Sequence, residues 1–489
     1  MFKVLKNQFA FGLFILIIGP LYSQINSEID CYSIIAGKSA TNDNSVMLAH
    51  NEDDYGEYVF NFYKVPGIDR DKNQLINTDT EAKIEQVSQT YSFLWIDMPQ
   101  LQFSDSYMNE WGVTIASDQC LSREDKPELV DGGIGYYLRR IMTERAMSAK
   151  NAVKIGASLV EKYGYNASGR TYCIADPDEI WMMAVVNGKH WVAQRIPADH
   201  VAVISNCYTI GEIDLRDTSN FLGSSDIIEY AVKRGWYDPD SGKKFSFKHA
   251  YAKENSLDSD GNKPRQLAAI NFLSEKQYKL TDNLPFSFKP LGKVSKEKLM
   301  MILANHFENT QMREEEDILN DPHHFELNTI CSSGNQYGFV AQLRRDLPAE
   351  IGYVLWIAMK RPCIQPYLPL YFGVSRIPAS FTHGEHEKAL KDHFADIDRK
   401  DIMKQSAFWQ YIGLTDASDK NYRELHGFMQ YYKAKTEKNL LKNQALFEET
   451  FLSLYSVNRN SAQEYLNNYV SEIMMENLKN TINALEILK

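Results

Sequence analysis

The segment from Asp30 to Asp53 constrains the fold of this chain more than any other stretch. It holds two short apolar runs, Tyr32–Ala36 and Val46–Ala49, and the polar turn Asn42–Asn44 lies between them. Such a pattern predicts a β-hairpin. Paired strands would bring Cys31, just before the first run, to the same end of the hairpin as the segment from His50 to Asp53. The second run leads into an acidic cluster, Glu52 to Asp54.

The first 23 residues have the pattern of a secretory signal. Lys3 and Lys6 precede an apolar run that ends at Gly19-Pro20. The run is shorter than the about 20 apolar residues that span a bilayer. We therefore assign residues 1–23 to a signal peptide and 24–30 to a leader, and expect an exported protein, periplasmic or extracellular, without stable membrane insertion after signal removal. The alternatives are an uncleaved anchor and a lipoprotein signal, but no small residue stands before Cys31 as lipidation requires.

The charge of the chain excludes one class of partner. It has 53 lysine and arginine residues against 64 aspartate and glutamate residues, and its net charge is -11. Removing residues 1–30 takes away two lysines and two acidic residues, so the net charge stays the same. No block of lysine or arginine offers a phosphate-binding surface. We therefore expect no nucleic acid as a partner.

The 489 residues, of which 44% are hydrophobic, suffice for a large core. We place a main domain at 31–380 and a helical region at 381–489. The six cysteines are scattered: Cys31, Cys120, Cys173, Cys207, Cys331 and Cys363. If Cys31 is a reactive thiol, five remain and cannot all pair, so we do not expect structural disulfides.

Strand and helix patterns are mixed along the main domain. Strand-like runs cover 57–65, 91–98, 171–175, 179–186, 190–194, 201–205, 338–343 and 352–359, and helical patterns cover 133–147, 151–163, 225–234 and 295–306. Hairpins mixed with helix pairs predict stacked antiparallel sheets covered by helices rather than a doubly wound parallel sheet. Beyond about Ser380 apolar residues recur at helical spacing, as in Leu425, Phe428 and Tyr432. They predict amphipathic helices that close the main domain or form a dimer contact.

Common catalytic motifs are absent. There is no Gly-x-Ser-x-Gly elbow, Walker loop, dinucleotide fingerprint or His-Glu-x-x-His helix. Histidines cluster at His323 and His324 with Glu326, and at His383, His386 and His393. Their spacing matches no zinc motif, and we interpret them as solvated polar faces. The sequence thus predicts no metal and no other cofactor.

Cys31 differs from the other cysteines because a short removable leader precedes it. Cleavage after Asp30 would make it the first residue of the chain. Its α-amino group, with an unperturbed pKa of about 7.7 to 8.0, could then take the thiol proton directly or through one water. Without that context a lone cysteine is more often structural.

The same residues resemble a known family. Cys31 to Asp53, with Gly-Lys-x-Ala-x-x-Asp-x-Ser and Asn-Glu-Asp elements, is similar to the start of the dipeptidase A-type cysteine peptidases. These are N-terminal-nucleophile hydrolases related to penicillin V acylase, bile salt hydrolase and secernin. Further similar segments are Asn109–Ala116, Gly133–Arg140, Val203–Asn206, Cys331–Ser333 and Gln342–Arg344.

The resemblance implies an α+β fold, a four-layer αββα sandwich with a C-terminal helical region, in which self-cleavage exposes the nucleophile for amide hydrolysis without metal. It assigns Cys31 as the nucleophile, Asp53 as the carboxylate that orients the α-amino group, and Asn206 as a polar group near the acyl or oxyanion site. We expect a further oxyanion donor in 117–119. His50 departs from the family, because the acylases and many of the dipeptidases carry arginine there, and its role stays open. Asn44 stands where the family often has glycine, a position that asparagine also tolerates.

The expected activity is that of a secreted dipeptidase acting on short peptides or small amides. Two alternatives remain. One is an acylase of penicillin V or bile-salt type, which needs a larger apolar pocket, and the other is a non-catalytic secreted binding protein on the same fold. The sequence also leaves a homo-oligomer open.

Overall fold

The computed structural model describes residues 31–54, 59–69, 74–78, 80–99, 102–324, 327–393 and 405–488. The predicted signal peptide and leader, and Glu326 of the first histidine cluster, lie outside these residues. In the described part of the chain no helix has the length and apolar character needed to cross a membrane.

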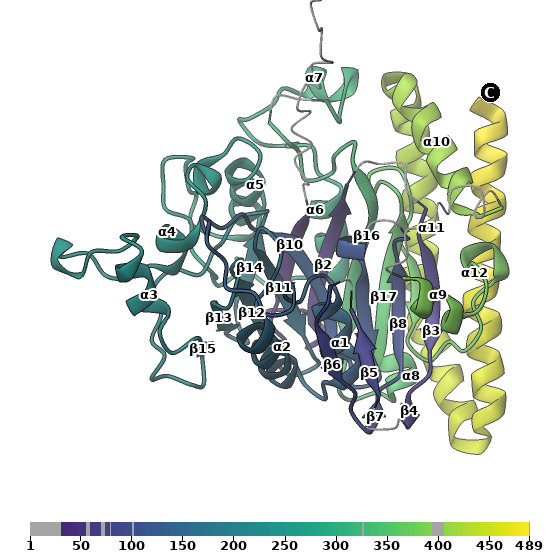
Figure 1. Ribbon diagram of the computed structural model, residues 1–489. Helices are drawn as coiled ribbons and strands as arrows, with labels where there is room; N and C mark the ends of the chain where they lie inside the picture. The colour runs from purple at the N-terminus through teal and green to yellow at the C-terminus, as the bar shows by residue number, and fades with distance from the viewer. Residues whose placement is uncertain are drawn as a thin grey trace, which may run out of the picture.

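Two antiparallel sheets form the centre of the fold (Figure 1). The first has six strands in the order β14-β1-β2-β16-β17-β18. In chain order they are β1 (Tyr32–Ala36), β2 (Val46–Asp53), β14 (Val201–Ile204), β16 (Asn335–Leu343), β17 (Tyr353–Met359) and β18 (Leu368–Tyr371).

The second sheet has eight strands in the order β15-β13-β12-β11-β10-β9-β8-β3. They are β3 (Asn61–Val65), β8 (Phe93–Asp97), β9 (Ser106–Asn109), β10 (Thr114–Gln119), β11 (Arg170–Ala175), β12 (Ile180–Val185), β13 (Trp191–Ile196) and β15 (Phe221–Gly223). Two short pairs stand apart, β4 (Ile68–Asp69) with β7 (Gln89–Thr90) and β5 (Leu75–Asn77) with β6 (Lys83–Glu85).

Both faces of the central strands are buried, as β12 illustrates. All six of its residues are buried. Because side chains alternate across a strand, Met182 and Ala184 join the core between the two sheets, where they meet residues of β1 and β2. Trp181 and Met183 face the other way, into a second core under α1 (Tyr137–Arg145) and α2 (Ala149–Tyr163).

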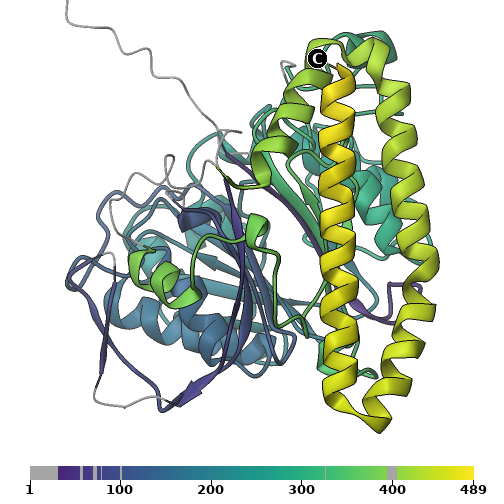
Figure 2. The ribbon, with the colours of Figure 1, turned by 90° about the vertical axis from the view of Figure 1, so that its right-hand side faces the viewer.

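Helices cover the outer face of the six-stranded sheet as well. They include α5 (Lys263–Leu273) and α6 (Lys296–Leu303), and the two long C-terminal helices α11 (Tyr422–Val457) and α12 (Arg459–Leu488), which contact β18. Figure 2 shows these long helices side by side along one side of the molecule. The order helix, sheet, sheet, helix confirms the predicted α+β fold with four αββα layers and a helical C-terminal region.

The remaining α-helices are α3 (Ile227–Lys233), α4 (Phe247–Tyr251), α7 (Glu315–Asn320), α8 (Ala349–Gly352), α9 (His386–Asp392) and α10 (Phe408–Lys420). Most of them are short, and α10 packs on α11 and α12. An ion pair between Arg344 Nη2 and Glu448 Oε1, 2.8 Å apart, ties the end of β16 to α11. The domain boundary near residue 380 stays a prediction.

Most predicted elements are found at their places, and the exceptions have local causes. The helix expected from Gly133 begins only at Tyr137, because Gly132 and Gly133 have φ values of 80° and 81°, outside the helical region. The next helix ends as predicted at Gly164, which has φ 79°. Asn44 has φ 55°, so asparagine does occupy a left-handed position in the hairpin turn.

Candidate active site

The predicted hairpin is present and sets the position of Cys31. In the register of β1 and β2, Tyr32 pairs with Asn51 and Ser33 with His50. Cys31 directly precedes β1 and is buried, with 0% of its surface exposed. Its Sγ lies 3.2 Å from Glu52 Oε1 and 3.9 Å from the carbonyl oxygen of Asp53. The acidic cluster, expected to follow the second strand, instead begins inside it, since β2 continues to Asp53.

A chain of hydrogen bonds leads from the Cys31 thiol into the protein interior. One carboxyl oxygen of Glu52 accepts a hydrogen bond from the Cys31 thiol, and the other lies 3.0 Å from His50 Nε2. His50 Nδ1 is 2.8 Å from Ser33 Oγ, and the Ser33 hydroxyl donates to Asp118 Oδ2 at 2.7 Å. All five side chains are fully buried, with 0% exposure. His50, whose role the sequence left open, is therefore the central link of this chain.

The direction of these bonds fixes where the protons lie. Because the Ser33 hydroxyl donates to Asp118, its oxygen must accept from Nδ1–H of His50. Burial lowers the pKa of His50 to about 4, so the ring is neutral and Nε2 is an acceptor. Glu52 must then donate a proton to Nε2. Burial also raises the pKa of Glu52 to about 8. The raised pKa of Glu52 and the lowered pKa of His50 therefore both place the shared proton on Glu52 near neutral pH.

The thiol itself is held in its protonated form. Burial raises the pKa of Cys31 well above its ordinary value, and the nearby carboxyl groups of Glu52, Asp54 and Asp118 raise it further. A thiolate at this position therefore needs a base or a new cation close by. A neutral Glu52 limits the repulsion that a thiolate would meet.

Asp53 is fixed by a turn that precedes β16. Its Oδ2 accepts hydrogen bonds from the Ser332 hydroxyl and from Asn335 Nδ2, the latter at 3.3 Å. Gly334 packs so closely that an added Cβ would lie 2.0 Å from Asp53 Oδ1. The carboxylate is thus held rigidly at the end of the hairpin that carries Cys31, and it is 2% exposed.

Asn206 reaches Cys31 through a buried arginine. Arg265 in α5 donates to the Cys31 carbonyl oxygen at 3.2 Å and to Asn206 Oδ1 at 3.0 Å. Asn206 follows β14, the neighbour of β1, and has φ 44°. Its Nδ2 is buried and has no hydrogen-bond partner among the described residues. An unpartnered buried N–H donor beside the nucleophile can bind an oxyanion.

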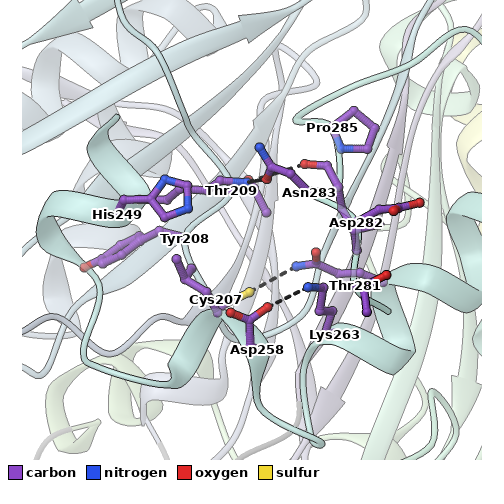
Figure 3. Close-up of a pocket in the computed structure, with 14 residues that line it drawn as sticks. Cys207, Tyr208, Thr209, His249, Asp258, Lys263, Thr281, Asp282, Asn283 and Pro285 are labelled. Carbon is purple, nitrogen blue, oxygen red and sulfur yellow. Dashed lines mark hydrogen bonds and ion pairs between the residues drawn. The ribbon is translucent and has the colours of Figure 1, made fainter. Parts of the chain in front are cut away.

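A cavity of about 280 Å³ lies next to this group (Figure 3). Cys207 and Gln266 line it, and they follow Asn206 and Arg265 in the sequence. Lys248 and Lys263 also line it, together with Asp258 and Asp282, so its wall carries both positive and negative charges. The lining does not include Cys31, so the cavity borders the site without containing the sulfur atom.

The predicted oxyanion segment 117–119 lies close to the same network. Ser117 Oγ accepts from Arg170 Nη1 at 2.8 Å, Asp118 accepts from Ser33, and Gln119 Nε2 donates to Ser168 Oγ at 3.0 Å. The three side chains are therefore engaged with protein partners. A donor from this segment stays a prediction.

The interpretation of the histidine clusters as solvated faces is wrong for two members. His393 is 2% exposed, with Nε2 2.8 Å from Asp105 Oδ2 and Nδ1 3.3 Å from Asp97 Oδ1. His323 is 7% exposed, and its sequence neighbour His324 points outward. Carboxylates lie against ring nitrogens of both histidines, Asp97 and Asp105 at His393 and Asp419 at His323, and a pattern of sequence spacing does not reveal such contacts.

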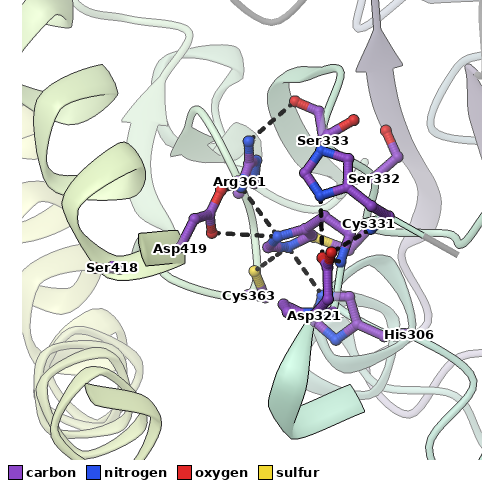
Figure 4. Close-up of polar contacts among 12 residues, drawn as sticks. His306, Asp321, Cys331, Ser332, Ser333, Arg361, Cys363, Ser418 and Asp419 are labelled. Atoms are coloured by element: carbon purple, nitrogen blue, oxygen red, sulfur yellow. Dashed lines mark hydrogen bonds and ion pairs between the residues drawn. The ribbon is translucent and has the colours of Figure 1, made fainter. Parts of the chain in front are cut away.

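The structure also groups His323 with partners that are remote in sequence. His306, His323, Cys331 and Cys363 each place one possible ligand atom within 4.8 Å of all the others (Figure 4). All six cysteines of the chain are free thiols and buried. Of the described residues, this group and Asp97, Asp105 and His393 are the buried ones that could hold a metal ion.

Several functional residues were not found from the sequence. Arg265 lies in a helix with no local signal, Ser332 lies in a segment similar to the family, and Asn335 lies outside every predicted element. Glu52 had a signal, since it belongs to the acidic cluster and its register opposes Cys31. The pairing of Ser33 with His50 also follows from the hairpin register, because both side chains lie on one face of the sheet.

Comparisons with known proteins agree with this geometry. The model of peptidase family C69 matches residues 30–433. A probable dipeptidase of Latilactobacillus sakei is 24% identical over 433 residues, which cover 82% of this chain and 90% of that protein. Dipeptidase A of Lactobacillus helveticus is 24% identical over 372 residues, which cover 72% of this chain and 77% of that protein.

One solved structure was also found to be similar. It is a mutant of the conjugated bile acid hydrolase from Clostridium perfringens, 11% identical, covering 70% of this chain and 92% of that chain with a TM-score of 0.31. The match to the family model covers most of the chain and begins one residue before Cys31.

Proposed function

Because the chain belongs to peptidase family C69, we propose that it is a dipeptidase that uses the Cys31 thiol as its nucleophile. Cleavage between Asp30 and Cys31 frees the α-amino group, which becomes the general base. The observation that carries this proposal is the position of Cys31, whose sulfur contacts a buried acid and whose carbonyl oxygen shares the Arg265 guanidinium with the buried amide of Asn206.

The reaction then proceeds in two steps. The α-amino group takes the thiol proton, and the sulfur attacks the substrate carbonyl while Nδ2 of Asn206 donates to the developing oxyanion. The leaving amine takes the proton from the α-ammonium, and a thioester to Cys31 remains. Water activated by the same amine hydrolyses the thioester, which releases the acid and restores the thiol.

Asp53 has the role of placing the α-amino group. Its carboxylate is locked by Ser332 and Asn335 at the end of the hairpin where that amine is created. The α-ammonium that forms during the reaction also supplies the nearby cation that the buried thiol otherwise lacks, and so favours the thiolate.

A small substrate with a carboxylate suits the cavity beside this site. Its volume, about 280 Å³, is below the about 300 to 1,000 Å³ typical of pockets for drug-sized ligands. Lys248 offers positive charge for a free C-terminus, whereas Lys263 is paired with Asp258, 2.6 Å away. Similarity to proteins named dipeptidases favours this substrate over a large conjugated amide.

The residues before Cys31 fit export and processing. Two lysines and an apolar run precede the leader, as in a secretory signal. We expect the active protein in the periplasm or outside the cell, acting on short peptides without nucleic acid and without stable membrane insertion. A homo-oligomer is compatible with this function.

The test is to express the full chain and measure intact mass and dipeptide hydrolysis for the parent, Cys31→Ala and Cys31→Ser. We expect the parent to begin at Cys31 and to hydrolyse dipeptides. Cys31→Ala should keep the leader and be inactive. Cys31→Ser should lose several orders of magnitude in turnover, about 10³-fold or more, because an alcohol is poorly matched to an amine base. Active protein that begins before Cys31, or active Cys31→Ala, would overturn the proposal.

A further inference from the structure

Four buried side chains behind Asp53 form a compact group that the proposed reaction does not use. They are His306, His323, Cys331 and Cys363, and they are between 0% and 7% exposed. His306 Nε2 lies 3.2 Å from His323 Nε2, and His323 Nε2 lies 3.4 Å from Cys363 Sγ. They come from three connections: His306 follows α6, His323 and Cys331 both lie between α7 and β16, and Cys363 lies between β17 and β18.

The spacing of these atoms is that of a tetrahedral zinc site. Bonds of about 2.3 Å to sulfur and 2.0 to 2.1 Å to nitrogen place the ligand atoms of such a site about 3.3 to 3.8 Å apart. The two separations above are near this range, and all pairs lie within 4.8 Å. Binding an ion would therefore need only a small contraction of the group.

Both imidazoles are already oriented for coordination. His306 Nδ1 lies 2.7 Å from Glu308 Oε1, and His323 Nδ1 lies 3.2 Å from Asp419 Oδ1. A proton on each Nδ1, donated to these carboxylates, leaves both Nε2 lone pairs directed at the centre of the group. Carboxylate partners of this kind are usual behind zinc-bound histidines.

We propose that His306, His323, Cys331 and Cys363 bind one Zn²⁺ ion through two Nε2 atoms and two Sγ atoms. Four protein ligands complete the tetrahedron, so the site is structural and leaves no position for substrate or water. Each thiol releases one proton to solvent on binding. The two thiolate charges then balance the charge of the ion, which suits a buried site.

The ion would join three parts of the fold next to the catalytic hairpin. Cys331 precedes Ser332, whose hydroxyl holds Asp53. Asp419, which orients His323, lies in the last turn of α10 in the C-terminal helical region. Zinc would thus hold the turn that fixes Asp53 and anchor the C-terminal helices to the six-stranded sheet, without taking part in the reaction.

Two metal-free arrangements compete with this one. In the first, Arg361 Nη1, 3.0 Å from His323 Nδ1, donates to that nitrogen, and the two Nε2 atoms share a hydrogen bond. In the second, Cys331 and Cys363 are oxidised to a disulfide. Both are outcomes that the experiment separates.

The experiment measures metal content in the full chain, expressed with zinc in the medium and purified without chelators. We expect about one zinc per chain, and a loss of most of it in Cys363→Ser and His323→Ala. His324→Ala and Cys120→Ser are the matched controls, because His324 is exposed and Cys120 bonds Thr171 instead. Both controls should keep the zinc.

A spectroscopic measurement keeps the test decisive if the ligand variants fail to fold. The parent is exchanged with Co²⁺, and a site with two thiolates should give sulfur-to-cobalt charge-transfer bands in the near ultraviolet and strong d–d bands in the visible. Cys31→Ala should give the same spectrum, since Cys31 is outside the group. Parent protein without zinc and without the cobalt bands, or with a Cys331–Cys363 disulfide by mass, would overturn the proposal.

Discussion

The two sulfur sites of this protein differ in what surrounds the sulfur atom. At Cys31 a single thiol ends a chain of hydrogen bonds through Glu52 and His50. The amide of Asn206, which shares Arg265 with the Cys31 carbonyl, leaves its Nδ2 without a partner among the described residues. In the group of four, two thiols face two imidazoles whose outer nitrogens are each paired with a carboxylate. The site at Cys31 thus offers a hydrogen-bond donor to a reacting group. The group of four offers nitrogen and sulfur atoms that can act as ligands of an ion.

The difference shows that the partner of a cysteine, rather than its burial, indicates its chemistry. Every cysteine of the chain is buried, so exposure does not separate reactive thiols from ligands or core residues. What separates them is the hydrogen-bonding capacity that the folded chain leaves unused. The predictions below test whether the two sites are as independent as their surroundings indicate.

The largest expected effect is the contrast between alkylation and chelation in the processed chain. Alkylating Cys31 should abolish dipeptide hydrolysis, because the nucleophile is lost. A short exposure to a chelator should leave the rate unchanged, since the reaction uses a thiol and an amine and the proposed zinc is buried. Peptide mapping of the alkylated chain identifies the modified thiol. Loss of activity on brief chelation, with Cys31 unmodified and the chain still folded, would contradict the separation of the two sites.

Asp53→Asn is expected to have the next largest effect. The amide keeps the shape of the side chain but loses the charge that orients the α-amino group, and loss of such a positioned group typically costs about 10²- to 10⁴-fold in rate. Because Ser332 and Asn335 both donate to this oxygen, asparagine can keep one carbonyl toward them, and the chain should still fold. Thermal midpoint, leader removal and dipeptide turnover are measured together. Parental turnover in a folded, processed variant would remove Asp53 from the site.

Much of the fold could be predicted because its signals are local. The apolar runs of the hairpin, the glycine that ends α2 and the Ser295 cap of α6, whose side chain accepts from Lys298 N, are all determined by neighbouring residues. The site residues Cys31, His50 and Asp53 lie on that hairpin, so its register brings them to one end. Asn206 needed the resemblance to a family, because it lies far along the chain, just after β14.

The rest depends on contacts between distant segments, for which the sequence carries no pattern. Arg265 reaches Cys31 across 234 positions, and Ser332 reaches Asp53 across 279. The four residues of the proposed zinc site come from three connections, and no spacing motif marks them. A zinc motif can be recognised in a sequence when two ligands lie a few residues apart, on one turn or one helix.

Glu52→Gln is expected to have the smallest effect at neutral pH and a larger one in alkaline solution. Glutamine reproduces the protonated acid, because its Oε1 can accept from the Cys31 thiol while its amide donates to His50 Nε2. Turnover at pH 7 should therefore stay within about tenfold of the parent, less than the loss expected for a positioned acid or base. Glu128→Gln, a change at an exposed carboxylate, is the matched control.

The stabilities of the parent and of Glu52→Gln should diverge as the pH rises, and proton linkage determines which of the two becomes less stable. Burial raises the pKa of Glu52 from 4.5 to about 8, so the folded chain holds this proton more tightly than the unfolded chain does. Its contribution to the free energy of unfolding is complete below pH 4.5, declines as the pH rises, and is lost above about pH 8. The thermal midpoint of the parent relative to Glu52→Gln should thus fall between pH 5 and pH 9, by about 1 °C for each kcal/mol lost in a chain of this length. Glu128→Gln should follow the parent throughout. If the parent and Glu52→Gln kept a constant difference over this range, Glu52 would be ionised at neutral pH, and the neutral hydrogen-bonded chain from Cys31 to Asp118 would have to be abandoned.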